Sequence, residues 1–117
     1  MEETYRGLYI ISVVSRLIEM HPQTLRKYER KGFIAPARTI GMLRLYSEKD
    51  LERLRLIKHL VEDMELNLAG VELTLQLWDR LVALREAIDQ AADGTELRRT
   101  LEEHLDSIFG LLQASPR

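Results

Sequence analysis

A short basic helix followed at once by a basic hairpin constrains the fold of this chain more than any other feature. Proline is favoured in the first turn of a helix and glycine just past the last turn, so Pro22 and Gly32 predict a helix that ends near Lys31. Residues 33–46 then place Gly41 at or near a tip, between arms that carry basic and aromatic side chains. The sequence therefore predicts a hairpin directly after the helix.

A further helix is expected upstream of this pair, over residues 12–20. Ser12 is a favourable N-cap, and apolar side chains follow it at helical spacing. His21 and Pro22 interrupt this helix, so two short helices joined by a tight turn result. Leu25 and part of the side chain of Tyr28 are expected to turn inward in the second of them. Its polar side chains share the other face: Gln23, Arg26, Lys27 and Arg30.

Ser47 and Asp50 have the S-x-x-D spacing of a helix start, in which the serine caps the helix and the acidic residue complements the helix dipole. A third helix is expected from there to about Val61. Its apolar residues are expected to close a small core against the first two helices: Leu51, Leu54, Ile57, Leu60 and Val61. These elements predict a mainly α fold, a winged helix-turn-helix whose wing is the hairpin. Such a module lays its second helix in the DNA major groove and sets the wing against phosphates.

The rest of the chain is expected to be helical. Asn67 is an N-cap candidate, Asp93 and Gly94 break the pattern, and a last helix from about Thr95 to Gln113 can fold back along its predecessor. The long helix carries two apolar stripes, so we expect one to pack on the N-terminal domain and the other on a partner helix. We therefore divide the chain into a winged helix-turn-helix domain over residues 1–66 and a helical region for dimerisation and partner binding over residues 67–117.

One stripe of the long helix alternates spacings of three and four residues, as in the seam of a coiled coil. The residues predicted to form a dimer contact lie in this stripe: Leu77, Leu81, Leu84, Ile88 and Ala91.

The net charge of −2 conceals a division between the two halves of the chain. Residues 1–60 hold 12 Lys and Arg against 7 Asp and Glu, whereas residues 61–117 hold 5 against 12. A basic half can collect phosphates, whereas an acidic half repels DNA and suits protein contacts. An accidental split is the alternative to such a division of roles.

Length and composition disfavour several other classes of protein. A chain of 117 residues leaves little room for a large enzyme pocket, and the absence of cysteine removes disulfides and thiolate nucleophiles. No apolar run reaches the length of a membrane span, and the acidic start Met1-Glu2-Glu3 is unlike a secretory signal. The sequence holds no catalytic motif. We therefore expect a cytoplasmic, nucleoid-associated protein that is not an enzyme and needs no cofactor.

Isolated residues that could suggest a site have simpler interpretations. The three histidines His21, His59 and His104 are scattered, so surface or capping roles are favoured over a zinc site. Trp78 could line an effector site, but an anchor in the core or the dimer seam is favoured.

Two runs carry a family resemblance. They are His21-Pro22-Gln23-Thr24-Leu25-Arg26-x-Tyr28-Glu29-Arg30-x-Gly32 and Pro36-x-Arg38-Thr39-x-Gly41-x-x-Arg44-x-Tyr46-Ser47. Through them, residues 9 to about 72 resemble the DNA-binding region of MerR-type transcription regulators, and specifically the heat-shock repressor (HspR-type) branch. The segment 67–71 also resembles that branch.

The resemblance implies a homodimer whose long helices pair antiparallel and whose two winged helices bind an inverted repeat in double-stranded DNA. It also implies repression of chaperone operons, with a DnaK-type chaperone as co-repressor. Arginines can bind a guanine edge or a phosphate, and hydroxyl groups are typical phosphate partners. The residues expected to contact DNA are Arg16, Gln23, Thr24, Arg26, Lys27 and Tyr28 from the helices, and Arg38, Thr39, Arg44 and Tyr46 from the wing.

This sequence departs from the family pattern in places. Lys27 stands where many relatives have a tyrosine, and Met42, Leu43 and Leu45 replace glycine- and arginine-rich wing residues, so we expect fewer phosphate contacts from this wing. The chain lacks the C-terminal cysteines of the metal-sensing branches, which disfavours sensing by a metal.

Two other functions stay open on the sequence. Residues 66–91 also look similar to chaperone modulators of the CbpM type, which keep a MerR-like body but bind a DnaJ-like co-chaperone. An architectural DNA-bending protein or a phage-type excisionase would bind DNA without a regulatory partner. The basic helix and wing favour DNA over the chaperone modulator, because a pure protein-binding descendant has no electrostatic reason to keep them.

Overall fold

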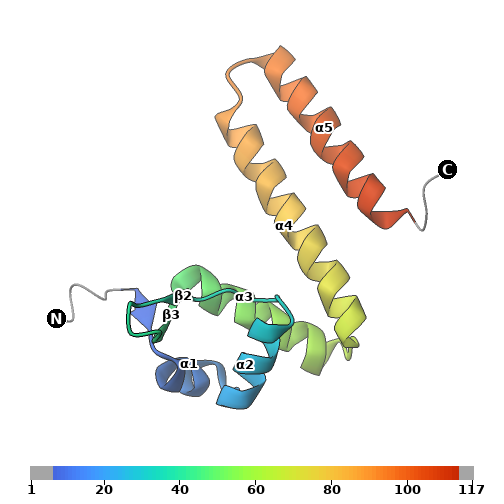
Figure 1. The fold of residues 1–117 in the computed structure, drawn as a ribbon. Helices are drawn as coiled ribbons and strands as arrows, with labels where there is room; N and C mark the ends of the chain where they lie inside the picture. The colour runs from blue at the N-terminus through green and yellow to red at the C-terminus, as the bar shows by residue number, and fades with distance from the viewer. Residues whose placement is uncertain (1–6, 114–117) are drawn as a thin grey trace. The chain divides into compact units, whose positions relative to one another are not determined.

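The computed structural model describes residues 7–113, so the acidic start of the chain lies outside the described part. It divides into two compact units, residues 1–71 and 72–117, and Figure 1 shows the path of the chain through both. The elements in chain order are β1 (Leu8–Tyr9), α1 (Ile11–Ile18), α2 (Pro22–Arg30), β2 (Ala37–Arg38), β3 (Arg44–Ser47), α3 (Glu48–Lys58), a π-helical turn (His59–Asp63), α4 (Leu68–Gln90) and α5 (Gly94–Leu112). Among the described helices, none combines the length and hydropathy needed to cross a membrane.

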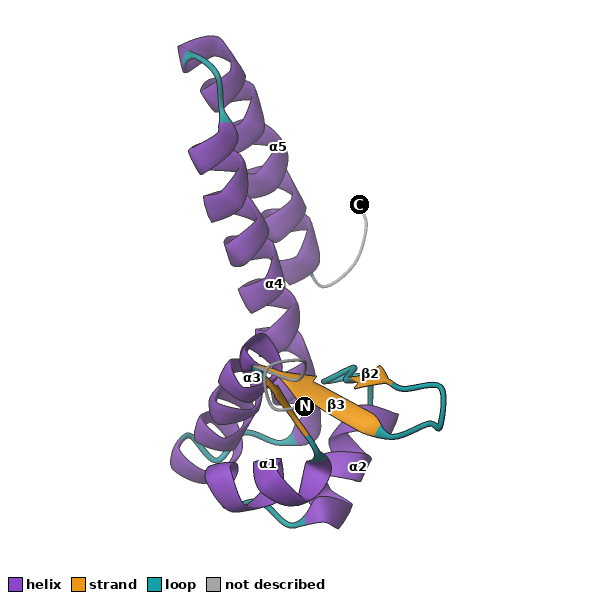
Figure 2. Ribbon diagram, turned by 90° about the vertical axis from the view of Figure 1, so that its left-hand side faces the viewer, coloured by secondary structure: helices purple, strands orange, loops and turns teal. Residues whose placement is uncertain are grey.

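The expected hairpin exists and belongs to a small antiparallel sheet with the order β1-β3-β2 (Figure 2). In β2 and β3, Ala37 pairs with Leu45 and Arg38 with Arg44. The strand β1, which the sequence did not suggest, pairs with the other edge of β3 and places Tyr9 opposite Tyr46. Gly41 lies in the tip as predicted, but the left-handed residue of that turn is Met42, with φ of 65°.

The helix α1 starts earlier than expected, and the prediction that Ser12 is its N-cap is wrong. Ile10 occupies the N-cap position with extended backbone angles and makes no side-chain cap. Because Tyr9 still pairs in the sheet, the helix begins as soon as the chain leaves β1, and the carbonyl of Ile10 accepts from the amides of Val13 and Val14 at 3.1 Å. The helix ends at Ile18 rather than Met20, because Glu19 turns left-handed with φ of 57°.

The bounds of α2 confirm the predicted helix. Pro22 is its first residue, Lys31 is its C-cap, and Gly32 adopts φ of 79°, a conformation that favours glycine. His21 is the N-cap and uses its ring, because Nδ1 accepts a hydrogen bond from the amide of Gln23 at 3.0 Å. A capping role for this histidine is therefore confirmed.

Ser47 and Asp50 form the predicted capping box at the start of α3. The amide of Asp50 donates to the hydroxyl of Ser47 at 3.1 Å, and the amide of Ser47 donates to the carboxylate of Asp50 at 2.8 Å. The helical path continues beyond the expected end near Val61, through the π-helical turn to Asp63. The next helix, α4, begins at Leu68, and the side chain of Asn67 just before it accepts from the amide of Gly70 at 2.8 Å.

The core of the N-terminal unit gathers apolar side chains from α1, α2, α3, the central strand β3 and the segment after α2. Four of the five apolar residues predicted in α3 and beyond are buried, whereas Val61 is only half-buried. Tyr28 and Phe33 stack with ring centroids 5.9 Å apart, so the segment after α2 is fixed to that helix. The buried side chains include Val14, Ile18, Leu25, Tyr28, Phe33, Ile34, Tyr46, Leu51, Leu54, Ile57 and Leu60.

The helices α4 and α5 run antiparallel and lie side by side in both views (Figures 1 and 2). Asp93 caps α5 by accepting from the amide of Glu96 at 2.8 Å, close to the predicted break. Arg80 on α4 donates to the carbonyl of Ser107 on α5 at 3.1 Å and also to the hydroxyl of that serine. The prediction that the last helix folds back along its predecessor is confirmed.

Candidate nucleic-acid interface

The outer face of α2 carries the polar residues that the helical spacing predicted. Gln23, Lys27 and Arg30 are exposed, whereas Arg26 is half-buried. The opposite face is fixed in the core by Leu25, which is fully buried. Burial of one face leaves the other free for a groove of DNA.

The hydroxyl of Tyr46 does not lie where a contact with DNA requires it. Tyr28 is only 6% exposed, and Tyr46 is fully buried, with a hydroxyl that has no hydrogen-bond partner among the described residues. Burial raises the pKa of both hydroxyls, which keeps them neutral. We therefore correct the expectation that the Tyr46 hydroxyl binds phosphate, whereas a phosphate contact by Tyr28 stays a prediction. Tyr46 was placed on an arm of the hairpin, but that arm is the central strand of the sheet, so one of its faces is buried.

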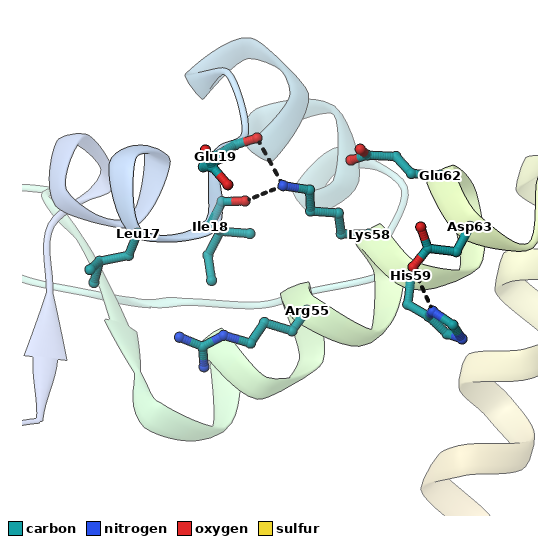
Figure 3. Close-up of a pocket in the computed structure, with 8 residues that line it drawn as sticks. All are labelled: Leu17, Ile18, Glu19, Arg55, Lys58, His59, Glu62 and Asp63. Carbon is teal, nitrogen blue, oxygen red and sulfur yellow. Dashed lines mark hydrogen bonds and ion pairs between the residues drawn. The ribbon is translucent and has the colours of Figure 1, made fainter.

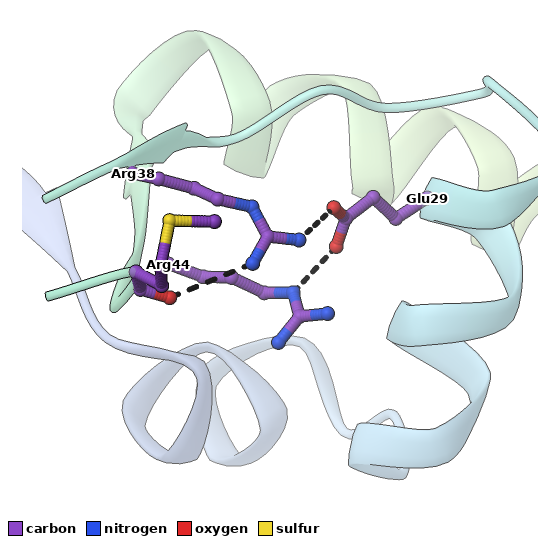
Figure 4. Close-up of polar contacts among 4 residues, drawn as sticks. Glu29, Arg38 and Arg44 are labelled. Atoms are coloured by element: carbon purple, nitrogen blue, oxygen red, sulfur yellow. Dashed lines mark hydrogen bonds and ion pairs between the residues drawn. The ribbon is translucent and has the colours of Figure 1, made fainter. Parts of the chain in front are cut away.

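The wing arginines lie in paired positions and meet one acidic residue of α2. Arg38 and Arg44 are cross-strand partners, and both bind the carboxylate of Glu29 (Figure 4). Nη2 of Arg38 lies 2.5 Å from Oε2, and Nε of Arg44 lies 2.5 Å from Oε1. The carboxylate therefore ties the wing to the helix. We refer to these three side chains as the wing clamp.

The charge state of Glu29 reflects its two partners. Burial alone would raise the pKa of this carboxyl group, but the hydrogen bonds from Arg44 and Arg38 outweigh burial and hold the pKa below its usual value. The side chain is 20% exposed, against 31% for Arg38 and 26% for Arg44. The clamp is therefore partly shielded from solvent. The spacing of residues in the sequence did not indicate a role for Glu29, although it is the only acidic residue between Glu19 and Glu48.

The remaining residues expected to contact DNA occupy mixed positions. Arg16 is exposed in the last turn of α1, and Thr24 is half-buried on α2. Thr39 has an internal role, because its hydroxyl accepts a hydrogen bond from the amide of Leu43 at 3.1 Å and so closes the wing turn. The tip beyond it is apolar and exposed, with Ile40 and Met42 among its most exposed side chains.

The predicted dimer residues of α4 fall into two sets in the helical hairpin. Leu77, Leu84 and Ala91 are half-buried, whereas Leu81 and Ile88 are exposed, at 52% and 39%. The single predicted seam is therefore two neighbouring stripes, only one of which is partly covered within a single chain.

A hollow of about 280 Å³ lies between the end of α1 and the end of α3 (Figure 3). Its walls carry both signs of charge, from Glu19, Arg55, Lys58 and Glu62, together with His59, whose Nδ1 lies 2.8 Å from a carboxylate oxygen of Asp63. Within residues 7–113, no three His, Cys, Asp or Glu side chains are grouped as metal ligands. The hollow is lined by residues from the end of α1, from α3 and from the π-helical turn, and by none from α2 or the wing.

Sequence comparison decides the family. Residues 9–78 match the model of the MerR HTH family regulatory proteins, and this match includes all of α2 and the wing. The chain belongs to the MerR family. The predicted family and fold class are therefore confirmed, and the protein is a DNA-binding transcription regulator.

Three named relatives show what this MerR-family protein is similar to. It is 42% identical over 78 residues to a protein of Streptomyces coelicolor named heat shock protein HspR, which covers 67% of this chain and 52% of that protein. It is 33% identical over 110 residues to the HTH-type transcriptional regulator GlnR of Bacillus cereus, covering 90% of this chain and 84% of GlnR. MlrA of Escherichia coli is 39% identical over 58 residues, covering 49% of this chain and 24% of MlrA. The MerR-family protein thus spans about half the length of HspR and most of GlnR.

Proposed function

We propose that this MerR-family regulator represses chaperone and other heat-shock genes by binding an inverted repeat as a homodimer. The observation that carries DNA recognition is the outward polar face of α2, where Gln23, Lys27 and Arg30 are exposed. The assignment to heat-shock genes is supported by the 42% identity to HspR.

Within this proposal, α2 enters the major groove and its side chains read base edges. Arg26 is the side chain that we assign to a guanine, because an arginine can bind O6 and N7 of that base together. Its half-buried position on α2 restricts the conformations of the side chain and so lowers the entropy lost on binding. Lys27 and Gln23 are assigned to phosphates or base edges beside it.

The homodimer is supported by one side of the α4/α5 hairpin. Apolar exposed residues directly follow half-buried positions on both helices, such as Trp78 after Leu77 and Phe109 after Ile108. In two antiparallel right-handed helices, the positions after the facing residues point to the same side of the pair. The residues on this side are Trp78, Leu81, Ile88, Leu105, Phe109 and Leu112, each between 39% and 59% exposed.

The other side of the hairpin is polar. The positions that precede the half-buried residues are exposed and include Gln76, Asp79, Glu86, Glu103 and Ser107. A hairpin with one apolar and one polar side suits association of two copies through the apolar side, because the exposed apolar area is then removed from water. A DnaK-type chaperone as co-repressor also belongs to the proposal. The acidic second half of the chain, residues 61–117, suits such a protein contact better than DNA.

The experiment that tests the proposal is selection of genomic fragments by the purified protein at near-physiological salt, followed by sequencing. Enrichment of an inverted repeat upstream of chaperone genes is the expected result. The variant Arg26→Ala should lose specific affinity by about 1 to 3 kcal/mol, as expected for a bidentate base contact. Arg55→Ala, on α3, is the matched control and should keep its affinity.

The alternatives make different predictions in the same experiment. A chaperone modulator of the CbpM type would enrich no fragment above background. An architectural protein would bind DNA without a preferred repeat, and its affinity would not respond to an added chaperone. The exposed polar face of α2 supports the DNA-binding reading over the first of these.

A further inference from the structure

The wing sets two like charges directly against each other. Arg38 and Arg44 are opposite residues of neighbouring antiparallel strands, and like charges in such pairs destabilise a sheet. Glu29 removes that conflict, because its two carboxylate oxygens bind one guanidinium each, at 2.5 Å (Figure 4). The cluster retains one net positive charge, which is available to an anion.

The two arginines are held through different atoms. Arg38 uses Nη2 for Glu29, and its Nη1 donates to the carbonyl of Met42 in the wing turn at 3.5 Å. Arg44 uses only Nε for Glu29, and within residues 7–113 its Nη groups donate no hydrogen bond. Two parallel N–H groups of a guanidinium form the fork that binds a phosphate. Arg44 therefore keeps this fork free, whereas Arg38 does not.

We propose that Glu29 is a positioning residue, which holds Arg44 through Nε so that the two Nη groups bind a DNA backbone phosphate, and which commits Arg38 to holding the wing turn. The inference rests on the proposed DNA-binding function and divides two arginines that the sequence treats alike. Orienting the guanidinium before DNA arrives lowers the entropy lost on binding. The cost of placing a carboxylate near a phosphate is reduced, because two guanidinium groups bind Glu29.

The salt dependence of DNA binding tests this division of roles. The logarithm of the affinity falls linearly with the logarithm of salt concentration, and each phosphate contact contributes about 0.9 to the slope. The probe is one duplex of fixed sequence, so the slope can be measured whether or not an operator is known. Glu52→Gln, an exposed residue of α3, changes the net charge by the same amount as Glu29→Gln and serves as the control.

The expected results differ between the two arginines. Arg44→Ala should reduce the slope by about 0.9 for each bound protomer, because each protomer then loses one phosphate contact. Arg38→Ala should leave the slope near the wild-type value. Glu29→Gln should weaken binding about tenfold despite its added positive charge, and should add nothing further in an Arg44→Ala background. Glu52→Gln should bind no more weakly than the wild type.

Several results would overturn the positioning role. Tighter binding and a steeper slope for Glu29→Gln would show that the carboxylate only masks the arginines. Additive losses of DNA affinity in the double variant of Glu29 and Arg44 would show that Glu29 does not act through Arg44. If urea denaturation shows that Glu29→Gln does not fold, the two arginine variants still test the proposal. Equal slopes for Arg38→Ala and Arg44→Ala would overturn the division of roles between these arginines. Failure of the wild type to bind any duplex would instead refute the proposed function, together with this inference.

Discussion

Lys58 donates a hydrogen bond of 2.8 Å to the carbonyl oxygen of Ile18, forty residues earlier in the chain (Figure 3). A longer contact of 3.4 Å reaches the carbonyl of Glu19. Ile18 is the last residue of α1, so the ammonium group satisfies carbonyls that the end of that helix leaves without intrahelical partners. The same contact joins the first helix of the unit to α3.

Replacing Lys58 with methionine should therefore destabilise the fold. The variant keeps most of the apolar stem but leaves the carbonyls of Ile18 and Glu19 without the charged donor, so we expect a loss of about 1 to 2 kcal/mol in the free energy of unfolding. Urea denaturation followed by circular dichroism measures this loss. Lys49→Met, at an exposed position of α3, is the control and should change stability by less than about 0.5 kcal/mol. Equal stability of the two variants would refute the capping role.

Two serines near helix starts should respond differently to alanine. Ser47→Ala removes the acceptor of the capping box and should cost about 1 kcal/mol. Ser12→Ala should be neutral or slightly stabilising, because Ser12 is exposed inside α1 and the cap position belongs to Ile10. The comparison uses the midpoints of urea denaturation. A comparable loss in Ser12→Ala would restore that serine as the cap.

Tyr46→Phe should stabilise the protein. The hydroxyl of Tyr46 is buried without a hydrogen-bond partner in the described part of the chain, so its removal relieves a desolvation penalty of about 1 kcal/mol or more. DNA affinity should not change, because the hydroxyl is not accessible. Tyr9→Phe is the contrasting variant and should lose stability slightly, since the hydroxyl of Tyr9 donates to Glu48. A loss of DNA affinity in Tyr46→Phe would contradict the position of this ring in the core.

The wing clamp should make the free energy of unfolding depend on pH in the acidic range. Because the pKa of Glu29 in the folded protein lies below its unfolded value of about 4.5, ionised Glu29 stabilises the fold above that pH. This contribution is lost as the pH falls below about 4.5 and through the lower folded pKa. The stability difference between the wild type and Glu29→Gln should therefore shrink in acid. Urea midpoints of both proteins, measured from neutral pH downward, check this, and a difference that does not vary with pH would contradict it.

Leu81→Asp should prevent dimer formation without unfolding the chain. Leu81 is already 52% exposed in one chain, so a charge there costs little until a second copy covers it. Ala83→Asp places the same charge on an exposed position of α4 two residues away, on the polar side of the hairpin, and should leave the dimer intact. Sedimentation equilibrium distinguishes the two. A Leu81→Asp variant that remains a dimer would show that the apolar side of the hairpin is not the contact.

Much of the architecture was predictable because its signals are local. Pro22 marks the start of α2 and Gly32 follows its end, while Ser47 and Asp50 mark the start of α3. These signals are backbone preferences that act within a few residues. The hydrophobic spacing of α3 likewise predicted which of its side chains are buried. The predicted start of α1 was wrong, because the true start depends on the pairing of β1 with a strand far along the chain.

The interface was less predictable than the fold, because its details arise between elements. Helical spacing correctly separated the outer face of α2 from Leu25. It could not show that Glu29 joins Arg38 to Arg44, since that contact depends on how the wing packs on the helix. Nor could it show that Tyr46 is buried, because a two-residue period does not reveal which face of a central strand is covered.

The cap that His21 provides to α2 also fixes the tautomer of its ring. A ring nitrogen accepts a hydrogen bond only when it carries no proton, so the contact from the amide of Gln23 to Nδ1 places the proton of the neutral ring on Nε2. Because His21 is exposed, the second helix begins with an N–H donor that solvent or a ligand can reach.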